Sequence, residues 1–119
     1  MNTELWTYRT DVIGPETTDL TGFEIEARDG SIGKVDEATN ETGRSLLVVD
    51  TGPWIFGRKV MIPAGTIERI DHADRKLFVS LTKDQIKNSP EFDDSMVRDD
   101  EYRTRLGEYY DRTGWTNAA

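Results

Sequence analysis

Four consecutive branched apolar residues, Leu46–Val49, place the strongest constraint on how this chain can fold. A strand with one face in water alternates apolar and polar residues, whereas this run is apolar at every position. Gly52 and Pro53 follow where a chain would reverse, and a second apolar stretch then ends at Pro63. The segment 46–63 therefore predicts a strand that is covered on both faces, a loop and a second strand.

Two more strands are predicted before this segment. Residues 23–28 alternate between apolar and charged side chains, which is the pattern of a half-buried strand. Asp29 and Gly30 predict a hairpin turn, because both residue types tolerate a positive φ at its centre. The return strand, residues 32–38, has its apolar residues three apart rather than two, so Gly33 is predicted to mark a β-bulge.

The strands after the central segment complete the predicted fold. Residues 67–70 and 77–81 predict further short strands, separated by a polar turn. With the earlier segments they make six short strands within about seventy residues, joined by tight turns. Such spacing favours an all-β fold, a small barrel or sandwich, over a parallel α/β sheet, which needs helices between its strands.

A short helical turn is expected after the last strand. Thr82 and Gln85 have the spacing of a capping box, in which two orphan backbone N–H groups are satisfied reciprocally. Pro90 should end the turn, because the residue before a proline avoids the helical region. Ile86 is expected to anchor the turn on the end of the barrel.

Residues 99–111 have the pattern of an acidic amphipathic helix. Its apolar stripe consists of Tyr102, Leu106, Tyr109 and Tyr110. Gly107 opposes this helix by about 1 kcal/mol. Because such a short helix is marginal alone, it is expected to form only if the stripe packs, either on the chain's own barrel or on a second subunit.

The net charge of −8 is distributed unevenly along the chain. Residues 1–19 carry four acids and one base (−3), residues 20–89 eleven acids and ten bases (−1), and residues 90–119 eight acids and four bases (−4). We therefore expect an N-terminal arm over 1–18, a domain over 19–94 and an acidic tail over 95–119. The arm could be a flexible segment, or its aromatic residues Trp6 and Tyr8 could dock on the domain or on a partner.

No residue pattern predicts catalysis, a metal or a cofactor. The chain has no cysteine, and its single histidine, His72, lies in an acidic turn without convergent partners. The acidic clusters of the tail lack the alternation of a calcium loop, and no serine has a nucleophile-elbow context. The N-terminal residues do not resemble a signal peptide, and no segment approaches ~20 apolar residues, so the expected location is the cytoplasm.

The loop between the two central strands is the best candidate for a functional surface. Trp54 and Phe56 lie between Gly52-Pro53 and Gly57-Arg58. These aromatic side chains could cap an open barrel end, or they could form an exposed anchor with Arg58 for another protein or a second copy, because aromatic residues and arginine dominate interface energetics.

The middle of the chain, from about Asp19 to Asp94, resembles the PRC-barrel family. The resemblance is carried by the order and spacing of the segments 20–22, 29–35 (DGSIGKV), 47–50 (LVVD), 60–63 (VMIP) and 81–90 (LTKDQIKNSP). It implies a small six-stranded β-barrel, and the full-length pattern is similar to free-standing bacterial members of the family. Related domains, such as that of the photosynthetic reaction-centre H subunit, serve as docking and assembly modules, so the resemblance implies that general role and assigns no functional residue.

Three functions follow as hypotheses. The first is a non-enzymatic protein-interaction module that forms a homodimer, with contacts drawn from Trp54, Phe56, Arg58, Tyr102, Leu106 and Tyr109. The second is an RNA- or ribosome-associated factor, although an acidic chain disfavours nucleic acid in general; it requires a surface cluster among Arg28, Lys34, Arg44, Arg58 and Lys59. The third is a small-ligand sensor, which requires a polar cavity.

Overall fold

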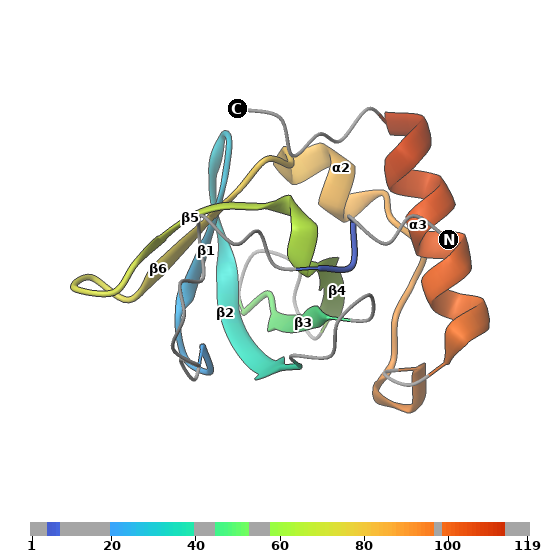
Figure 1. Cartoon of the computed structure of the whole chain (residues 1–119), viewed down its shortest axis with the longest axis horizontal. Helices are drawn as coiled ribbons and strands as arrows, with labels where there is room; N and C mark the ends of the chain where they lie inside the picture. The colour runs from blue at the N-terminus through green and yellow to red at the C-terminus, as the bar shows by residue number, and fades with distance from the viewer. Residues whose placement is uncertain (1–4, 8–19, 40–44, 53–57, 97–98, 114–119) are drawn as a thin grey trace.

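The computed structural model describes residues 5–7, 20–39, 45–52, 58–96 and 99–113 (Figure 1). The strands are β1 (Glu24–Ala27), β2 (Gly30–Ala38), β3 (Leu46–Asp50), β4 (Lys59–Pro63), β5 (Ile67–Asp71) and β6 (Lys76–Val79). The helices are α2 (Lys83–Lys87) and α3 (Asp100–Thr113), with 3-10 turns η1 (Ala64–Thr66) and η2 (Asp94–Met96).

The strands form one sheet in the order β4-β3-β2-β1-β6-β5. All neighbours are antiparallel except β1 and β6, which are parallel. The prediction of a β-rich fold with six strands is therefore confirmed. Within the described residues no backbone ladder joins β4 to β5, so the sheet remains open between these two ends.

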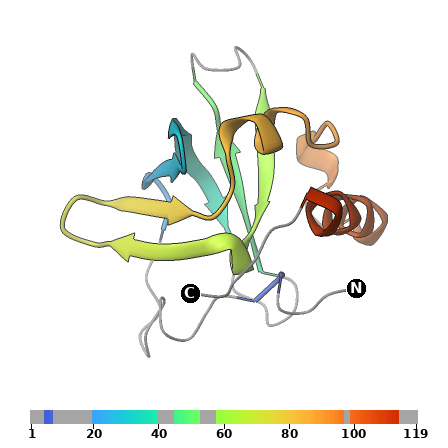
Figure 2. The same ribbon diagram turned by 90° about the horizontal axis from the view of Figure 1, so that it is seen from above.

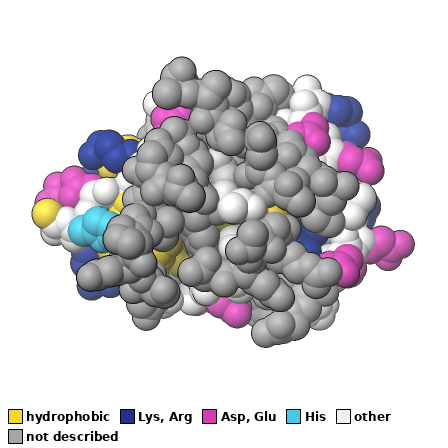
Figure 3. Space-filling model, viewed as in Figure 1, with side chains coloured by type: hydrophobic (Ala, Val, Ile, Leu, Met, Phe, Trp, Pro, Cys, Tyr) yellow, Lys and Arg dark blue, Asp and Glu magenta, His cyan; other side chains and the backbone are white. Residues whose placement is uncertain are grey.

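The β5–β6 hairpin extends away from the helices (Figures 1 and 2). Its turn is polar, and the backbone N–H of Asp74 donates to the Asp71 carboxylate over 3.0 Å. His72 is exposed there, as predicted, and is seen in cyan on the surface in Figure 3. Its ring meets the ring of Phe23 edge-on, with 6.2 Å between centroids.

The helical turn after the last strand has the predicted capping box. The Thr82 hydroxyl accepts from the backbone N–H of Gln85 over 3.2 Å, and the Gln85 side chain accepts from the backbone N–H of Thr82 over 2.8 Å. Ile86, the predicted anchor, is fully buried. The capping box thus begins α2 where the sequence indicates, and Ile86 fastens it to the core.

The β1–β2 hairpin differs from the prediction by one residue. Ala27 pairs with Gly30, so Arg28 and Asp29 are the central residues of the turn and Gly30 begins β2. The prediction that Asp29 and Gly30 are the central residues of this turn is therefore wrong. The physical reason is tertiary: the Asp29 carboxylate accepts the backbone N–H of Lys83 over 2.8 Å, which ties the turn to the first turn of α2.

Gly33 occupies the predicted β-bulge. Ile25 pairs with Gly33 but Glu26 pairs with Ser31, so β2 has one extra residue at this point. Gly33 has a φ of +148°, and a Cβ atom there would lie 2.1 Å from the carbonyl oxygen of Asp50. The end of β3 therefore crosses β2 at a distance that only glycine permits.

The strand register places charges of alternating sign in one row across the sheet. Successive pairs join the six residues Asp71, Lys76, Glu24, Lys34, Asp50 and Lys59, one from each strand. Residues paired in register point to the same face, so every charge in the row has neighbours of opposite sign. Like charges directly opposite each other destabilise a sheet, so the alternating row favours this register over alternatives that would bring like charges together.

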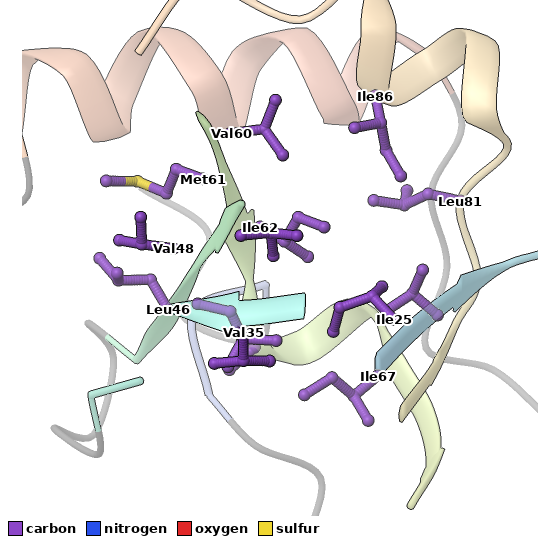
Figure 4. Close-up of a cluster of buried hydrophobic side chains, with 14 of the residues drawn as sticks. Ile25, Val35, Leu46, Val48, Val60, Met61, Ile62, Ile67, Leu81 and Ile86 are labelled. Atoms are coloured by element: carbon purple, nitrogen blue, oxygen red, sulfur yellow. The ribbon is translucent and has the colours of Figure 1, made fainter. Parts of the chain in front are cut away.

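Both faces of β3 are covered, as its apolar run predicts. Leu46, Leu47, Val48 and Val49 are all at most 1% exposed. Figure 4 shows Val48 and Met61 on one side of the β3–β4 pair, and Val60 and Ile62 on the other side, towards Leu81 and Ile86. Each face therefore needs a separate apolar layer.

Helix α3 belongs to the layer that covers the sheet on the β3–β4 side (Figures 1 and 2). Tyr102, Leu106 and Tyr110 are completely buried in the same core as the strands. Of the two alternatives left open by the sequence, the structure has the stripe packed on the chain's own sheet.

The N-terminal segment also enters this core. Leu5 and Trp6 are completely buried, the backbone N–H of Ser45 donates to the Trp6 carbonyl over 2.8 Å, and that of Gly65 donates to the Leu5 carbonyl over 2.7 Å. A Cβ atom on Gly107 would be 3.4 Å from the Trp6 indole nitrogen, so the indole packs directly against α3 at this position. Trp6 is thus docked, whereas Tyr8 lies outside the described residues. The core consequently extends beyond residues 19–94 in both directions.

Substitution of Gly33 tests the close crossing of β2 and β3. We expect Gly33→Ala to lower the free energy of unfolding by about 3 kcal/mol or more, because backbone atoms obstruct the methyl group. Gly52→Ala is the matched control: its φ of +55° is also unfavourable for alanine, but its Cβ would meet nothing within 4 Å, so it should cost about 1 kcal/mol. Urea denaturation measures both, and equal small losses would contradict the crossing.

Substitution of Leu106 tests whether α3 is part of the fold. Leu106→Ala should cost about 2–5 kcal/mol, because it removes a fully buried side chain from a packed core. Glu108→Ala, at an exposed position of the same helix, should change stability by less than about 0.5 kcal/mol. Similar values for the two variants would mean that α3 does not contribute to the core.

Candidate functional site

The loop between β3 and β4, residues 52–57, is called here the aromatic loop. Its two ends are held together, because the backbone N–H and the hydroxyl of Thr51 both donate to the carbonyl of Arg58, over 3.3 and 2.6 Å. Trp54 and Phe56, the predicted interaction residues of this loop, lie outside the described residues. The structure therefore establishes how the loop is attached.

The guanidinium group of Arg58 forms hydrogen bonds within the chain. It donates to the backbone carbonyls of Lys87 and Ser89 over 3.1 and 3.2 Å. These carbonyls lie at the C-terminal end of α2, where unpaired C=O groups carry partial negative charge and attract cations. Arg58, predicted as an interaction residue, thus ties the base of the aromatic loop to α2.

The predicted interaction residues of α3 lie mostly in the interior. Tyr102 and Leu106 are fully buried, and the Tyr102 hydroxyl donates to the carbonyl of Pro90 over 2.7 Å. Tyr109 is half-buried, and its hydroxyl donates to the carbonyl of Gln85 over 2.6 Å. Tyr109 alone of these three retains surface for a partner.

Burial keeps these tyrosines in the neutral form. It raises the pKa of Tyr102 to about 12, although the nearby Arg58 and Arg105 charges act in the opposite direction. Burial likewise raises the pKa of Tyr109, opposed by Arg112, and it raises the pKa of Tyr110. The phenol groups of Tyr102 and Tyr109 therefore act as hydrogen-bond donors that join α3 to the α2 region.

A cavity of about 460 Å³ opens beside the crossing of β2 and β3. It is lined by Glu24, Ser31, Ile32, Gly33, Lys34, Asp50, Thr51 and Gly52. The last register pair between β2 and β3 is Lys34 with Asp50. The bulge at Gly33 interrupts the regular pairing of β2 with β1 beside this pair, and the hollow lies at that irregularity.

Three charged side chains from three neighbouring strands surround this cavity. In the described part of the chain, the carboxylate of Glu24 and the ammonium group of Lys34 form no hydrogen bond or ion pair. Asp50 uses one carboxylate oxygen to accept the backbone N–H of Gly52 over 2.9 Å. The cavity therefore contains charged groups that can still form hydrogen bonds or ion pairs with a ligand.

The other two lysines of the row have ion-pair partners. Lys59 forms an ion pair with Asp36 at 3.0 Å, and Lys76 approaches Glu26 at 3.8 Å. Sequence reasoning did not find the cavity, because it treated its charged residues as ordinary solvent-facing positions of strands. Gly33 was the only local signal, and it indicated a bulge.

Among the residues that the structure describes, no three His, Asp or Glu side chains come together as a metal ion would require.

Comparison with models of known protein families finds no match, and comparison with curated proteins finds no relative. Of the helices within the described residues, none has the length and apolar composition needed to cross a membrane. Inference about the function of this chain therefore depends on its own residues and geometry.

The raised pKa of Tyr102 predicts a loss of stability in alkali. The folded-state pKa of about 12 exceeds the ordinary value of 10.0, so this contribution is fully present below pH 10 and is lost as the pH rises through 12. The Tyr102→Phe variant should lack this part of the decline. Urea denaturation of both proteins across this pH range measures the decline in stability. If the two proteins lost stability in parallel, the pKa of Tyr102 would not be raised by folding.

Proposed function

We propose that this chain is a non-enzymatic protein-interaction module of the PRC-barrel type, acting in the cytoplasm, which forms a homodimer through its aromatic loop. The observation that carries this proposal is the double attachment of the loop: Thr51 closes its ends on Arg58, and Arg58 is bound to the end of α2. A loop anchored in this way presents side chains at a lower entropic cost than a free segment.

The proposed barrel architecture is supported by the sheet order. β4 and β5 are the two ends of the sheet, yet they are consecutive in the chain and are joined only by η1. A sheet whose first and last strands are connected so closely must curve, and a barrel is the closed form of such a curved sheet. The short helix after the last strand agrees with the PRC-barrel resemblance of residues 81–90.

The chemistry of the aromatic loop favours a protein partner. Tryptophan and phenylalanine contribute large apolar areas to interfaces, and a few such residues supply most of the binding energy. Because Tyr102 and Leu106 are buried in the chain's own core, the proposed interface is centred on Trp54 and Phe56. Of the three interaction residues predicted on α3, Tyr109 keeps surface that could extend it.

The alternative of an RNA-associated factor receives little support from the basic residues. Arg28 forms an ion pair with Glu68 at 2.8 Å, Lys59 pairs with Asp36, and Arg58 is bound to carbonyl groups. Lys34 lies between two acids in the charge row, and Arg44 is outside the described residues. On the face in Figure 3, basic and acidic side chains are interspersed over the described surface, whereas RNA binding favours a continuous basic area.

The Trp54→Ser/Phe56→Ser double variant tests the proposed dimer. Wild-type protein at micromolar concentration should have the mass of a dimer by light scattering, and each substitution should weaken association at least about tenfold. Ala73→Ser, in the exposed β5–β6 turn, is the control and should leave the mass unchanged. A monomeric wild type, or a double variant that remains dimeric, would refute self-association through this loop.

A further inference from the structure

We propose that the cavity between β2 and the end of β3 binds a small zwitterion of the size of an α-amino acid or a dipeptide, with its carboxylate on Lys34 and its ammonium group on Glu24 or Asp50. This inference goes beyond the proposed dimer, because the cavity is formed within one chain, although Gly52 belongs both to its lining and to the aromatic loop.

The first argument is the order of the unpaired charges. Glu24, Lys34 and Asp50 are successive members of the charge row, on β1, β2 and β3. Residues directly paired across strands have Cα atoms about 4.5–5.5 Å apart. A positive group therefore lies between two negative groups, at separations that suit the two ends of one small molecule.

The second argument is selectivity between charge types. A simple anion that reached Lys34 would also meet the carboxylates of Glu24 and Asp50, and a simple cation would meet Lys34. A neutral ligand would displace water from three charged groups without replacing its hydrogen bonds, which costs free energy. Only a molecule with both charges complements the row.

The third argument is the size and chemistry of the floor. The volume of about 460 Å³ lies within the usual range of about 300–1,000 Å³ for small-molecule sites. Ile32 is almost fully buried at the cavity wall, and Gly33 adds no side chain that would fill it. The site can therefore accept an apolar side chain above the charged groups of the ligand.

The fourth argument is preorganisation. The bulge at Gly33 brings the backbone of Asp50 close to β2, and the Asp50 carboxylate is oriented by the backbone N–H of Gly52. Walls that are already held in place need little ordering when a ligand binds, which favours affinity in a small site.

The experiment is a titration of the isotope-labelled full chain, followed by the NMR shifts of its backbone amides. The probes are leucine and glycyl-leucine, which are zwitterions, leucinamide, which is only a cation, and N-acetylleucine, which is only an anion. We expect saturable shifts at Gly33, Lys34 and Gly52 with a zwitterion. Each blocked probe should bind at least about tenfold more weakly, a difference of about 1.4 kcal/mol.

Variants of the cavity charges sharpen the test. Lys34→Met and Glu24→Gln should each weaken zwitterion binding about tenfold, whereas Lys34→Arg should retain most of it. Glu37→Gln is the matched control, because Glu37 is exposed on β2 outside the cavity lining. Absence of saturable shifts with both zwitterions up to about 10 mM would overturn the proposal. So would blocked probes that bind as tightly as leucine, or a Lys34→Met variant with unchanged affinity.

Discussion

Burial of both faces of β3 is the constraint on which the rest of this structure depends. Its four apolar residues cannot be satisfied by one layer, so the sheet interior covers one face and a second layer must cover the other. That layer comes from distant parts of the chain, because α3 and the segment with Leu5 and Trp6 share the same core. Gly107, a residue with low helix propensity, lies where the Trp6 indole packs against α3.

A second constraint is the register of the sheet, and it connects the fold with the proposed ligand site. The bulge at Gly33 and the alternating charge row both specify how the strands pair, since a slip of one residue would exchange the two faces. Lys59 has an ion-pair partner, whereas Glu24 and Lys34 have none in the described part of the chain. Glu24 and Lys34 both line the cavity, so the row that aligns the strands also supplies charges of the site.

The candidate site shows where sequence reasoning reaches its limit. The apolar stripe of α3 predicted that Tyr102 and Leu106 would pack, either on the chain's own barrel or on a second subunit, because helical periodicity cannot tell which chain supplies the covering surface. Arg58 has the composition of an interface residue, yet the end of α2 binds its guanidinium. Glu24 and Lys34 belong to different strands, and their shared cavity depends on pairings that no local pattern contains.

The sequence by itself determined the six strands, the bulge at Gly33, the capping box of α2 and the helix at the C-terminus. Periodicity, capping and turn chemistry act over a few neighbouring residues, so they can be read directly along the chain. Only the tertiary structure decided that the tyrosine stripe packs on its own sheet, that Trp6 is docked, and that the turn at Asp29 shifts by one residue to meet α2. These outcomes depend on contacts between segments tens of residues apart, whose energies are set by packing in three dimensions.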